Sequence, residues 1–574
     1  MAKYRADLQD IYFNLFDLFK VQEHGDMTEQ DAREIIDSLN KFVENEVYPS
    51  RQEADHIGVK LVDKQVKVPE CFKSPQKQFY ENGWYALGYP EEIGGMPAPH
   101  AVSLACTSLV VGANVAFSMY YGLSKGAQNV ILAIGDEAQK NLYVPPMMEG
   151  RWGGTMCLTE ANAGSDVGAA KATANKQADG SYLIKGTKIF ISSGDNDLYE
   201  NIIHLVLART PGAPDGTKGL SLFIVPKYRI NSDGSNGANN DVVCSKIEEK
   251  MGLHASSTCV MNFGENNQCQ GFLIGKELEG MANMFIMMNE ARLLCGLQGE
   301  SQANLVYELT HQYASERSQF GIEIKNHPDV KRTLLRMRAM SRGLRMLNFY
   351  TATLFERLEK GEKEIESLIA LLTPVCKSYA SDEGFNVSVD AIQLHGGYGF
   401  CSEYGIEQFA RDIKIATIYE GTNGIQAIDF VMRKILKDQS QTFMGLGKLI
   451  QADLMNPVAQ EWKEEQALLA TSLQKAQEIL GAYGEMAKKK DFDRILTSTT
   501  DFLSFSGNLI VAWLHLKSAI AAKGAIASAS GEEKKFLQSK IEDYHVFCRL
   551  FVVKNLGLAK SILGFQSSLQ DIDV

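Results

Sequence analysis

The sequence predicts an α+β protein in which a compact β-domain interrupts a largely helical chain and a further helical domain follows. In residues 5–145, apolar residues recur at spacings of three and four, which is typical of helices with one buried stripe. Between about 152 and 270, short runs rich in β-branched and aromatic residues alternate with turns, a pattern typical of strands. Helical spacing returns from 279 to about 437, and again over roughly 445–574.

The length and composition indicate a soluble protein of several domains. A chain of 574 residues is too long for one core, and its net charge of −12 argues against nonspecific binding to nucleic acid or anionic membranes. The ten cysteines contain no Cys-x-x-Cys pair, so we expect reduced thiols, no disulfide framework and no metal site. The charged N-terminal residues lack the apolar core of a signal peptide, and no apolar stretch approaches the length of a membrane span. We therefore expect a cytoplasmic protein with no integral membrane segment.

The change in texture along the chain predicts four segments. Residues 1–151 are expected to form an N-terminal helical domain, in which the Gly- and Pro-rich "GYPEEIGGMPAP" separates two helices. Residues 152–271 are expected to form the middle β-domain, with turns at "ADGS" and "APDGTKG". A helical bundle should occupy 272–440, and an extra helical domain should occupy 445–574.

Two segments of the β-domain carry candidate ligand-binding residues. "MCLTEANAGSDVGAAKATA" (156–174) offers the hydroxyls of Thr159 and Ser165, and its small residues let a ligand ring approach the backbone. "KIFISSGDND" (188–197) ends a strand with Phe190 and two serines, although a strand aromatic is usually a core residue. A Gly/Ser/Ala loop alone is weak evidence, because many such loops are simply turns.

Two further segments lie in the helical region. In "YASERSQFG" (313–321), Arg317 is a candidate phosphate ligand because a guanidinium fork matches phosphate oxygens. In "QLHGGYGF" (393–400), the pair Gly396 and Gly397 allows backbone amides to come close to a pyrophosphate. The occurrence of all four segments in this order is a strong signal, whereas each alone is weak.

A single acid interrupts the apolar stretch "IYEGTNGIQAI" (418–428), where Glu420 directly precedes Gly421. Carboxylates are seldom fully buried unless they are paired or used. Glu420 could be a solvated acid at the end of a helix or strand, or it could be a functional carboxylate.

With "RDIKIATIYEGTNGIQ" added to the four segments, the sequence resembles the acyl-CoA dehydrogenase family over about residues 30–435. The resemblance implies a helical N-terminal domain, a middle β-barrel and a C-terminal four-helix bundle. It also implies that FAD is held between the β-domain and the bundle. The chain would be a homo-oligomer in which the neighbouring subunit completes each FAD site.

The resemblance assigns site residues by motif. It implies a set of cofactor-binding residues, namely Met156, Leu158, Thr159, Gly164, Ser165, Phe190, Ile191, Ser192, Arg317, Gln319, Phe320, Gln393, Gly396, Gly397, Thr422 and Asn423. It places four residues at the substrate, namely Ser165, Asn289, Arg292 and Gly421. Three positions depart from the common pattern: Met156 stands where an aromatic is common, Phe190 where Trp is common, and Asn423 where Ser is frequent.

The resemblance gives Glu420 the role of catalytic base. Removal of the α-proton of a thioester requires a carboxylate whose pKa is raised toward neutrality, which burial among apolar groups provides. The β-hydride would go to flavin N5. The amide N–H of the base and a ribityl hydroxyl of FAD would polarise the thioester carbonyl. Gly421 would let the chain turn so that the carboxylate and the amide both face the substrate.

Some members of the family place the base on an earlier helix, where this chain has "MMNEARLLCG". The matching position is Ala291, and Glu290 lies beside it. One residue rotates a helical side chain by roughly 100°, so we expect Glu290 to point elsewhere and not to be the base.

Both ends of the chain extend beyond the family core. "YRADLQDIYFNLFDLF" and roughly the last 130 residues resemble a larger bacterial branch, which includes broad-range fatty acyl-CoA dehydrogenases and 3-methylmercaptopropionyl-CoA dehydrogenases. In that branch the extra domain packs on the core bundle, where ordinary tetramers place their second dimer. A homodimer is therefore implied.

The main hypothesis is an FAD-dependent acyl-CoA dehydrogenase that passes electrons to an electron-transfer flavoprotein, with a 3-methylmercaptopropionyl-CoA dehydrogenase as the alternative. A DNA-associated flavoprotein of the alkylation-response type would carry a basic C-terminal domain, but residues 451–574 hold 14 Lys and Arg against 15 Asp and Glu. An acyl-CoA oxidase would use the same base with O2, but the missing peroxisomal signal and the bacterial-type ends disfavour it. A purely structural role would not require Glu420 together with the FAD segments.

Overall fold

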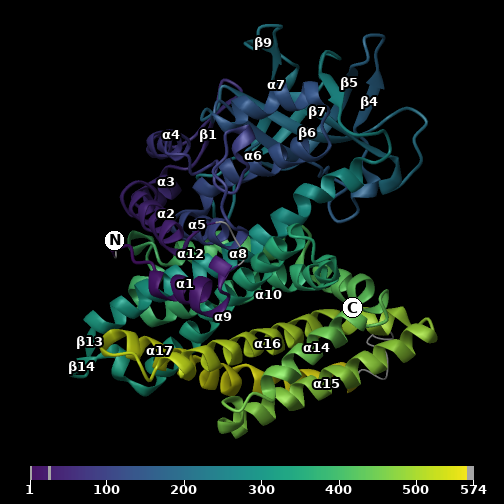
Figure 1. Ribbon diagram of the computed structural model, residues 1–574. Coiled ribbons are helices and arrows are strands. Elements are labelled where there is room, and N and C mark those ends of the chain that lie inside the picture. The colour runs from purple at the N-terminus through teal and green to yellow at the C-terminus, as the bar shows by residue number, and fades with distance from the viewer. Residues whose placement is uncertain (1–2, 24–26, 565–574) are drawn as a thin grey trace. The chain divides into compact units, whose positions relative to one another are not determined.

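The computed structural model describes residues 3–23 and 27–564, which fold into two compact units (Figure 1). The helical unit comprises Met1–Asn40, Pro99–Gly112 and Arg292–Val574. The β unit comprises Lys41–Ala98 and Ala113–Ala291. Because these units follow packing rather than chain order, the four segments expected from the sequence stay a prediction.

The β unit combines a large sheet with flanking helices. Its helices are α3 (Tyr48–Ile57), α4 (Lys73–Glu81), α6 (Val115–Ile134) and α7 (Glu137–Met148), and α8 (Gly280–Glu316) begins in it. Its strands are β1 (Lys60–Val62), β2 (Gln65–Lys67), β3 (Trp152–Cys157), β4 (Thr173–Lys176), β5 (Tyr182–Ser192), β6 (Asn201–Arg209), β7 (Leu220–Pro226), β8 (Tyr228–Ile230), β9 (Asn236–Asn239), β10 (Val242–Ile247), β11 (Thr258–Phe263) and β12 (Gln270–Leu273).

The main sheet has eight strands, and five of them close into a ring. The strand order is β10-β11-β5-β12-β7-β6-β3, and β4 pairs with both β5 and β6. The pairings of β4 therefore join the two ends of the run from β5 to β6, which makes the small barrel that the family resemblance implies. The pair of β3 and β6 is parallel, whereas β5, β7, β11 and β12 pair antiparallel with their neighbours.

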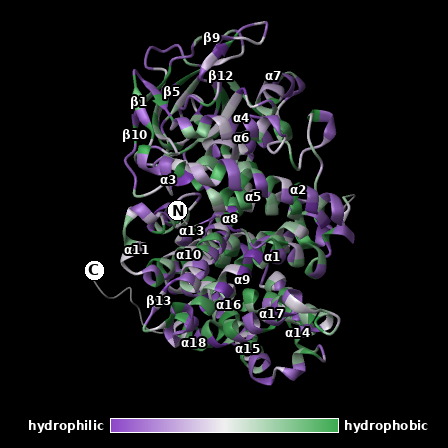
Figure 2. Ribbon diagram, turned by 90° about the vertical axis from the view of Figure 1, so that its left-hand side faces the viewer, coloured by the Kyte–Doolittle hydropathy of each residue, from purple (hydrophilic) through white to green (hydrophobic). Residues whose placement is uncertain are grey.

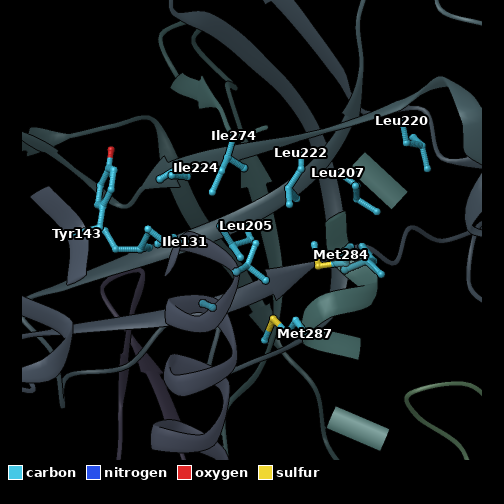
Figure 3. Packing of buried hydrophobic residues seen from close by; sticks show 14 of the residues in the cluster. Ile131, Tyr143, Leu205, Leu207, Leu220, Leu222, Ile224, Ile274, Met284 and Met287 are labelled. Atoms are coloured by element: carbon cyan, nitrogen blue, oxygen red, sulfur yellow. The ribbon is translucent and has the colours of Figure 1, made fainter. Parts of the chain in front are cut away.

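Strand β6 is buried on both faces and separates two apolar clusters. Successive side chains of a strand point to opposite faces. Leu205 and Leu207 pack with residues of α6, α7 and the start of α8, as Figure 3 shows for Ile131, Tyr143 and Met287. Val206 and Ala208 belong to the second cluster, in which they pack with residues of β4, β5, β7, β10 and β11. This explains why "IIHLVLA" is almost continuously apolar rather than alternating.

The helical unit is built from long helices. They are α1 (Leu8–Tyr12), α2 (Glu29–Phe42), α5 (His100–Ala113), the rest of α8, α9 (Pro328–Glu359), α10 (Glu366–His395), α11 (Gly397–Phe400), α12 (Glu407–Lys414), α13 (Asn423–Ile428), α14 (Gln441–Leu454), α15 (Lys463–Lys488), α16 (Phe492–Ala525), α17 (Gly531–Leu550) and α18 (Asn555–Gly564). A short hairpin of β13 (Ser318–Gln319) and β14 (Ile322–Glu323) follows α8. Among the described residues no helix is long and apolar enough to cross a membrane.

Glycines let the helices of this unit approach closely. A Cβ on Gly299 of α8 would lie 2.1 Å from the carbonyl oxygen of Ala380 on α10, so only glycine fits at this crossing. A Cβ on Gly507 of α16 would likewise lie 2.2 Å from the ring of Tyr379. Helix α16, which is largely apolar in Figure 2, therefore packs tightly on α10, as expected for the final helical segment.

The helices of the unit are also joined by a buried ion cluster, formed by Asp10, Glu300, Arg342, Arg345, Lys540 and Asp543. Asp10 of α1 accepts from Lys540 of α17 at 2.5 Å and from Arg345 of α9 at 2.7 Å. Arg345 also binds Glu300 of α8 at 3.2 Å, and Arg342 binds Asp543 at 3.0 Å. Burial alone would raise the pKa of Asp10, but Lys540, Arg345 and Arg342 hold that pKa well below its usual range.

Asp10→Ala should strongly destabilise the helical unit, because it leaves the cations of Arg345 and Lys540 buried without their shared partner. We expect a loss of about 3–5 kcal/mol in the free energy of unfolding, measured by urea denaturation. Lys535→Ala is the matched control, because Lys535 lies on α17, the helix of Lys540, but forms an exposed ion pair with Glu532. The control should leave the urea midpoint nearly unchanged. Equal effects of the two substitutions would contradict the prediction.

Candidate active site

Glu420 lies in a tight turn of the helical unit, just before α13. Its φ is +56° and that of Gly421 is +84°, so two successive residues adopt the left-handed conformation. This conformation is uncommon for a residue with a side chain and marks a site that its surroundings must hold in place. A Cβ on Gly421 would lie 2.6 Å from Nε2 of Gln426, so both the backbone angle and the space require glycine here.

Neighbouring side chains hold this turn. Gln426 Nε2 donates to the carbonyl oxygen of Glu420 at 3.0 Å. The hydroxyl of Thr422 caps α13 by accepting from the amide of Ile425 at 3.3 Å. On the other side of the acid, the Tyr419 hydroxyl donates to Oε1 of Gln298 on α8. The backbone around Glu420 is therefore fixed from both directions.

Asn423 ties the same turn to α10. Its Oδ1 accepts from Nζ of Lys377 at 2.8 Å. Its Nδ2 donates to the carbonyl oxygen of Ser378 at 3.2 Å and to Oγ of Ser381 at 3.1 Å. The amide of Asn423 is thus engaged within the helical unit, and its expected contact with a cofactor stays a prediction.

The environment of Glu420 suits a proton acceptor near neutral pH. The residue is half-buried, and burial raises the pKa of its carboxyl to about 7 although Arg292 and Lys377 act to lower it. Burial also lowers the pKa of Lys377 to about 8. A general base works best when its pKa lies near the working pH. The geometry therefore favours the functional interpretation of Glu420 over that of a solvated surface acid.

The structure brings together the two phosphate-binding segments predicted in the helical region. Arg317, just after α8, stacks over the ring of Tyr398 at 5.7 Å, and Tyr313 stacks on His395 at 4.2 Å between ring centroids. Residues from "ERSQFG" and "HGGYGF" thus form one cluster around the buried His395. The exposed residues Gln319, Phe320, Gln393, Gly396 and Gly397 belong to it by position.

This cluster is separate from the turn that carries Glu420. Lys377 and His395 are 18 residues apart on α10, which corresponds to about 27 Å along the helix. Within the helical unit, the predicted base and the predicted phosphate-binding residues therefore form two sites rather than one.

In the β unit, a buried ion pair anchors the loop that carries Leu158, Thr159, Gly164 and Ser165. Lys188 of β5, fully buried, donates to Oε1 of Glu160 at 2.8 Å and to the carbonyl oxygen of Leu158 at 2.9 Å. The Glu160 carboxylate also accepts from the amides of Lys171 and Ala172. The loop is thus held at its start and at its end, while Gly164 and Ser165 between them are exposed.

The end of β5 presents the other predicted residues of the β unit. Phe190 has a φ of +58° and 60% of its surface exposed, whereas the next residue, Ile191, is buried. An aromatic that packs in the core would not be exposed in this way, so Phe190 is not a core residue, and its contact with a ligand stays a prediction. Ser192, the last residue of β5, is partly exposed, and so is Met156 on β3.

Three glycines leave open space that a bound group could fill. A Cβ on Gly164, Gly396 or Gly397 would meet no atom within 4 Å. Their backbone is therefore accessible, as the close approach of an extended ligand such as a dinucleotide requires. The residues present thus fit the FAD that the sequence resemblance implies.

The sequence did not single out every residue at this site. Lys377, Gln298 and Gln426 hold or face the turn, and Lys377 could have been noticed as a lone cation in the apolar helical stretch "LLTPVCKSYA". The side chains of Asn289 and Glu290 lie outside what the structure describes, so their assignments stay predictions.

Comparisons with known families cover most of the chain. Models of the acyl-CoA dehydrogenase N-terminal, middle and C-terminal domains match residues 29–151, 155–265 and 279–436. A fourth model, described as acetyl-CoA dehydrogenase C-terminal like, matches residues 445–573.

Individual relatives are similar over nearly their whole length. A 3-methylmercaptopropionyl-CoA dehydrogenase of Ruegeria pomeroyi is 36% identical, over 96% of each chain. The broad-specificity linear acyl-CoA dehydrogenase FadE5 of Mycobacterium tuberculosis is also 36% identical, over 100% of this chain and 99% of that protein. A solved structure of an acyl-CoA dehydrogenase complexed with FAD, from Bacillus anthracis, shares the fold with a TM-score of 0.76 at 24% identity, covering 95% of this chain and 89% of that one.

Glu420→Gln should stabilise the protein at high pH. Because the carboxyl's pKa is raised from 4.5 to about 7, ionised Glu420 destabilises the folded state increasingly as pH rises through this range. Glutamine cannot ionise, so its free energy of unfolding should exceed that of the wild type. We expect the difference to be roughly 2–3 kcal/mol at pH 8 and less than about 1 kcal/mol at pH 5. Urea denaturation at the two pH values measures this difference. A difference that does not change with pH would show that the acid is not desolvated.

Proposed function

The chain belongs to the acyl-CoA dehydrogenase family, whose enzymes are FAD-dependent oxidoreductases acting on acyl-CoA, and we propose that it oxidises a saturated acyl-CoA thioester to the trans-2-enoyl-CoA. The observation that carries the proposal is Glu420, a half-buried acid in a left-handed turn whose pKa is about 7. In the proposed reaction the substrate loses an α-proton and a β-hydride, which creates the new double bond.

Glu420 takes the α-proton in this proposal. Its raised pKa makes the carboxylate basic enough near neutral pH, and the cations of Arg292 and Lys377 keep a fraction ionised. The main-chain N–H of Glu420 is assigned to the thioester carbonyl, where a hydrogen bond stabilises the developing enolate. Gly421 accommodates the turn that this double role requires. Arg292 is assigned to the substrate pocket beside the base.

FAD supplies the acceptor for the β-hydride when it is bound. In the β unit, the loop anchored by Lys188 and the exposed ring of Phe190 are assigned to the flavin. In the helical unit, the cluster around Arg317 and Gly396 is assigned to the ADP part, because a guanidinium and open backbone amides suit phosphates. We further propose an electron-transfer flavoprotein as the final acceptor of the electrons.

We propose that the acyl group is linear. The two relatives that are 36% identical act, by their names, on linear acyl-CoA and on 3-methylmercaptopropionyl-CoA. The 3-methylmercaptopropionyl group is itself an unbranched chain, with a sulfur in place of one methylene. Fatty acid β-oxidation is therefore the proposed pathway, and oxidation of the sulfur-containing thioester is the alternative.

We propose a homodimer in which each chain completes the cofactor site of the other. The cluster around Arg317 lies about 27 Å along α10 from Lys377 beside the base, so it is well placed to serve a second chain. Its aromatic side chains are unusually exposed, with Phe320 at 96% and Phe400 at 82%. Large exposed apolar residues that gather at one place are typical of an interface.

Purified protein loaded with FAD should lose its flavin absorbance anaerobically when a saturated acyl-CoA is added. The panel should run from short to long linear chains and include 3-methylmercaptopropionyl-CoA. Glu420→Gln should keep FAD and slow the bleaching roughly 100-fold or more, because an amide cannot accept the α-proton. Glu290→Gln is the control and should retain most of the activity. The reverse behaviour of the two variants would place the base on the earlier helix.

Light scattering should give the mass of two chains for the full-length protein. Helix α16 packs on α9 and α10, and α17 packs on α9, so the faces they cover are not available to join two dimers into a tetramer. Phe320→Asp should weaken the dimer and lower its FAD content together, since one surface is proposed to serve both purposes. A tetramer of wild-type chains, or a Phe320→Asp variant with full FAD content as a monomer, would refute the proposal.

A further inference from the structure

Lys377 is a buried cation that the proposed chemistry uses only as a charge acting on Glu420. Its side chain has no exposed surface, although it lies in the middle of α10 among apolar residues. Its ammonium donates at 2.8 Å to the neutral Oδ1 of Asn423, not to a carboxylate. A lysine is seldom fully buried unless it is paired or used, because removing its charge from water is costly. This cost requires a compensating role.

The contacts of Asn423 connect Lys377 to the backbone of the base. Asn423 is the first residue of α13, and the same short helix carries Gln426, whose side chain donates to the carbonyl oxygen of Glu420. Ser378 and Ser381 on α10 bind the other side of the Asn423 amide. Movement of Asn423 would therefore move α13 and release the left-handed turn at Glu420.

The charges around Glu420 come from two helices and its own turn. Arg292 and Cys295 lie on α8, Lys377 lies on α10, and Tyr419 precedes the acid. Burial keeps the thiol and the phenol neutral by raising the pKa of each. The groups that offset the burial of the Glu420 carboxylate are thus Arg292 and Lys377.

Lys377 has its own set of charged and titratable neighbours. Burial lowers its pKa to about 8, Cys295, Asp382 and Glu420 act to raise it, and Arg292 acts to lower it. At neutral pH the ammonium form therefore predominates, and it can stabilise the ionised base.

We propose that Lys377 is a positioning residue for the reaction: it holds Asn423, and through α13 the left-handed turn of Glu420, and it keeps a cation beside the carboxylate. The inference rests on the proposed function, because it assumes that Glu420 is the base. In this proposal Asn423 connects α10 to the turn of Glu420. Lys377 itself does not contact the reacting atoms in this scheme.

The test is the pH dependence of flavin reduction by acyl-CoA in FAD-loaded variants. Lys377→Met should raise the pH midpoint by about one unit, because the ionised base loses a nearby cation, and should lower the limiting rate about tenfold or more. Lys377→Arg keeps the charge and should stay close to the wild-type midpoint. Asn423→Ala should lower the limiting rate without raising the midpoint, because it breaks the connection but leaves the cation. Lys488→Met, an exposed lysine on α15, is the control for a change of total charge.

A second measurement does not depend on catalysis. The free energy of unfolding is measured against pH with and without the Glu420→Gln substitution. The pH range in which the two curves separate reports the titration of Glu420. In the Lys377→Met background this range should move upward by about one unit. An unchanged range together with an unchanged pH midpoint of reduction would overturn the inference. If Lys377→Met does not fold, Asn423→Ala decides, since a wild-type limiting rate in that variant would overturn it too.

The failure of the inference and of the proposed function can be told apart. If acyl-CoA compounds never reduce the wild-type flavin, the proposed function is wrong, and the stability measurement still tests whether Lys377 acts on Glu420. If the wild type is reduced and the Lys377 variants keep its rate and midpoint, the function stands and the positioning role is wrong.

Discussion

The helical unit depends on the buried ion cluster, because charges removed from water are tolerated only when every partner is in place. Asp10, Glu300, Arg342, Arg345, Lys540 and Asp543 come from the start of the chain, from the bundle and from the end of the chain. Apolar burial could hold these helices together in several registers, since it has no direction. The ion pairs select one arrangement, because a shift of any helix would leave a charge unpaired.

This arrangement extends to the turn of Glu420 through the close crossing of α8 and α10. With Gly299 against Ala380, the two helices lie close enough for residues of both to face Glu420. Arg292 and Gln298 come from α8, and Lys377 comes from α10. The acid therefore lies between groups of two helices rather than on a free loop, which suits its proposed role as a base that must meet one particular proton.

The sequence predicted the parts of the protein that depend on local pattern. Periodicity identified the helical and β regions, and the motif around Glu420 identified the acid whose pKa the structure raises. The pairing of Asp10 with Lys540 could not be predicted, because nothing local in either segment specifies a partner 530 residues away. Lys377 was missed for a related reason: its purpose depends on a helix crossing that is set by glycines elsewhere. The exposure of Phe190 could not be predicted either, since a strand aromatic is more often buried.

The contact between Asp10 and Lys540 also has a consequence for biosynthesis. These residues are 530 positions apart, so the N-terminal helix leaves the ribosome long before its partner exists. At about 5–20 residues per second, Asp10 waits on the order of 30–100 seconds for the lysine that neutralises it. The β unit has its residues available much earlier and can fold while synthesis continues. The helical unit, in contrast, can be completed only after translation has nearly finished.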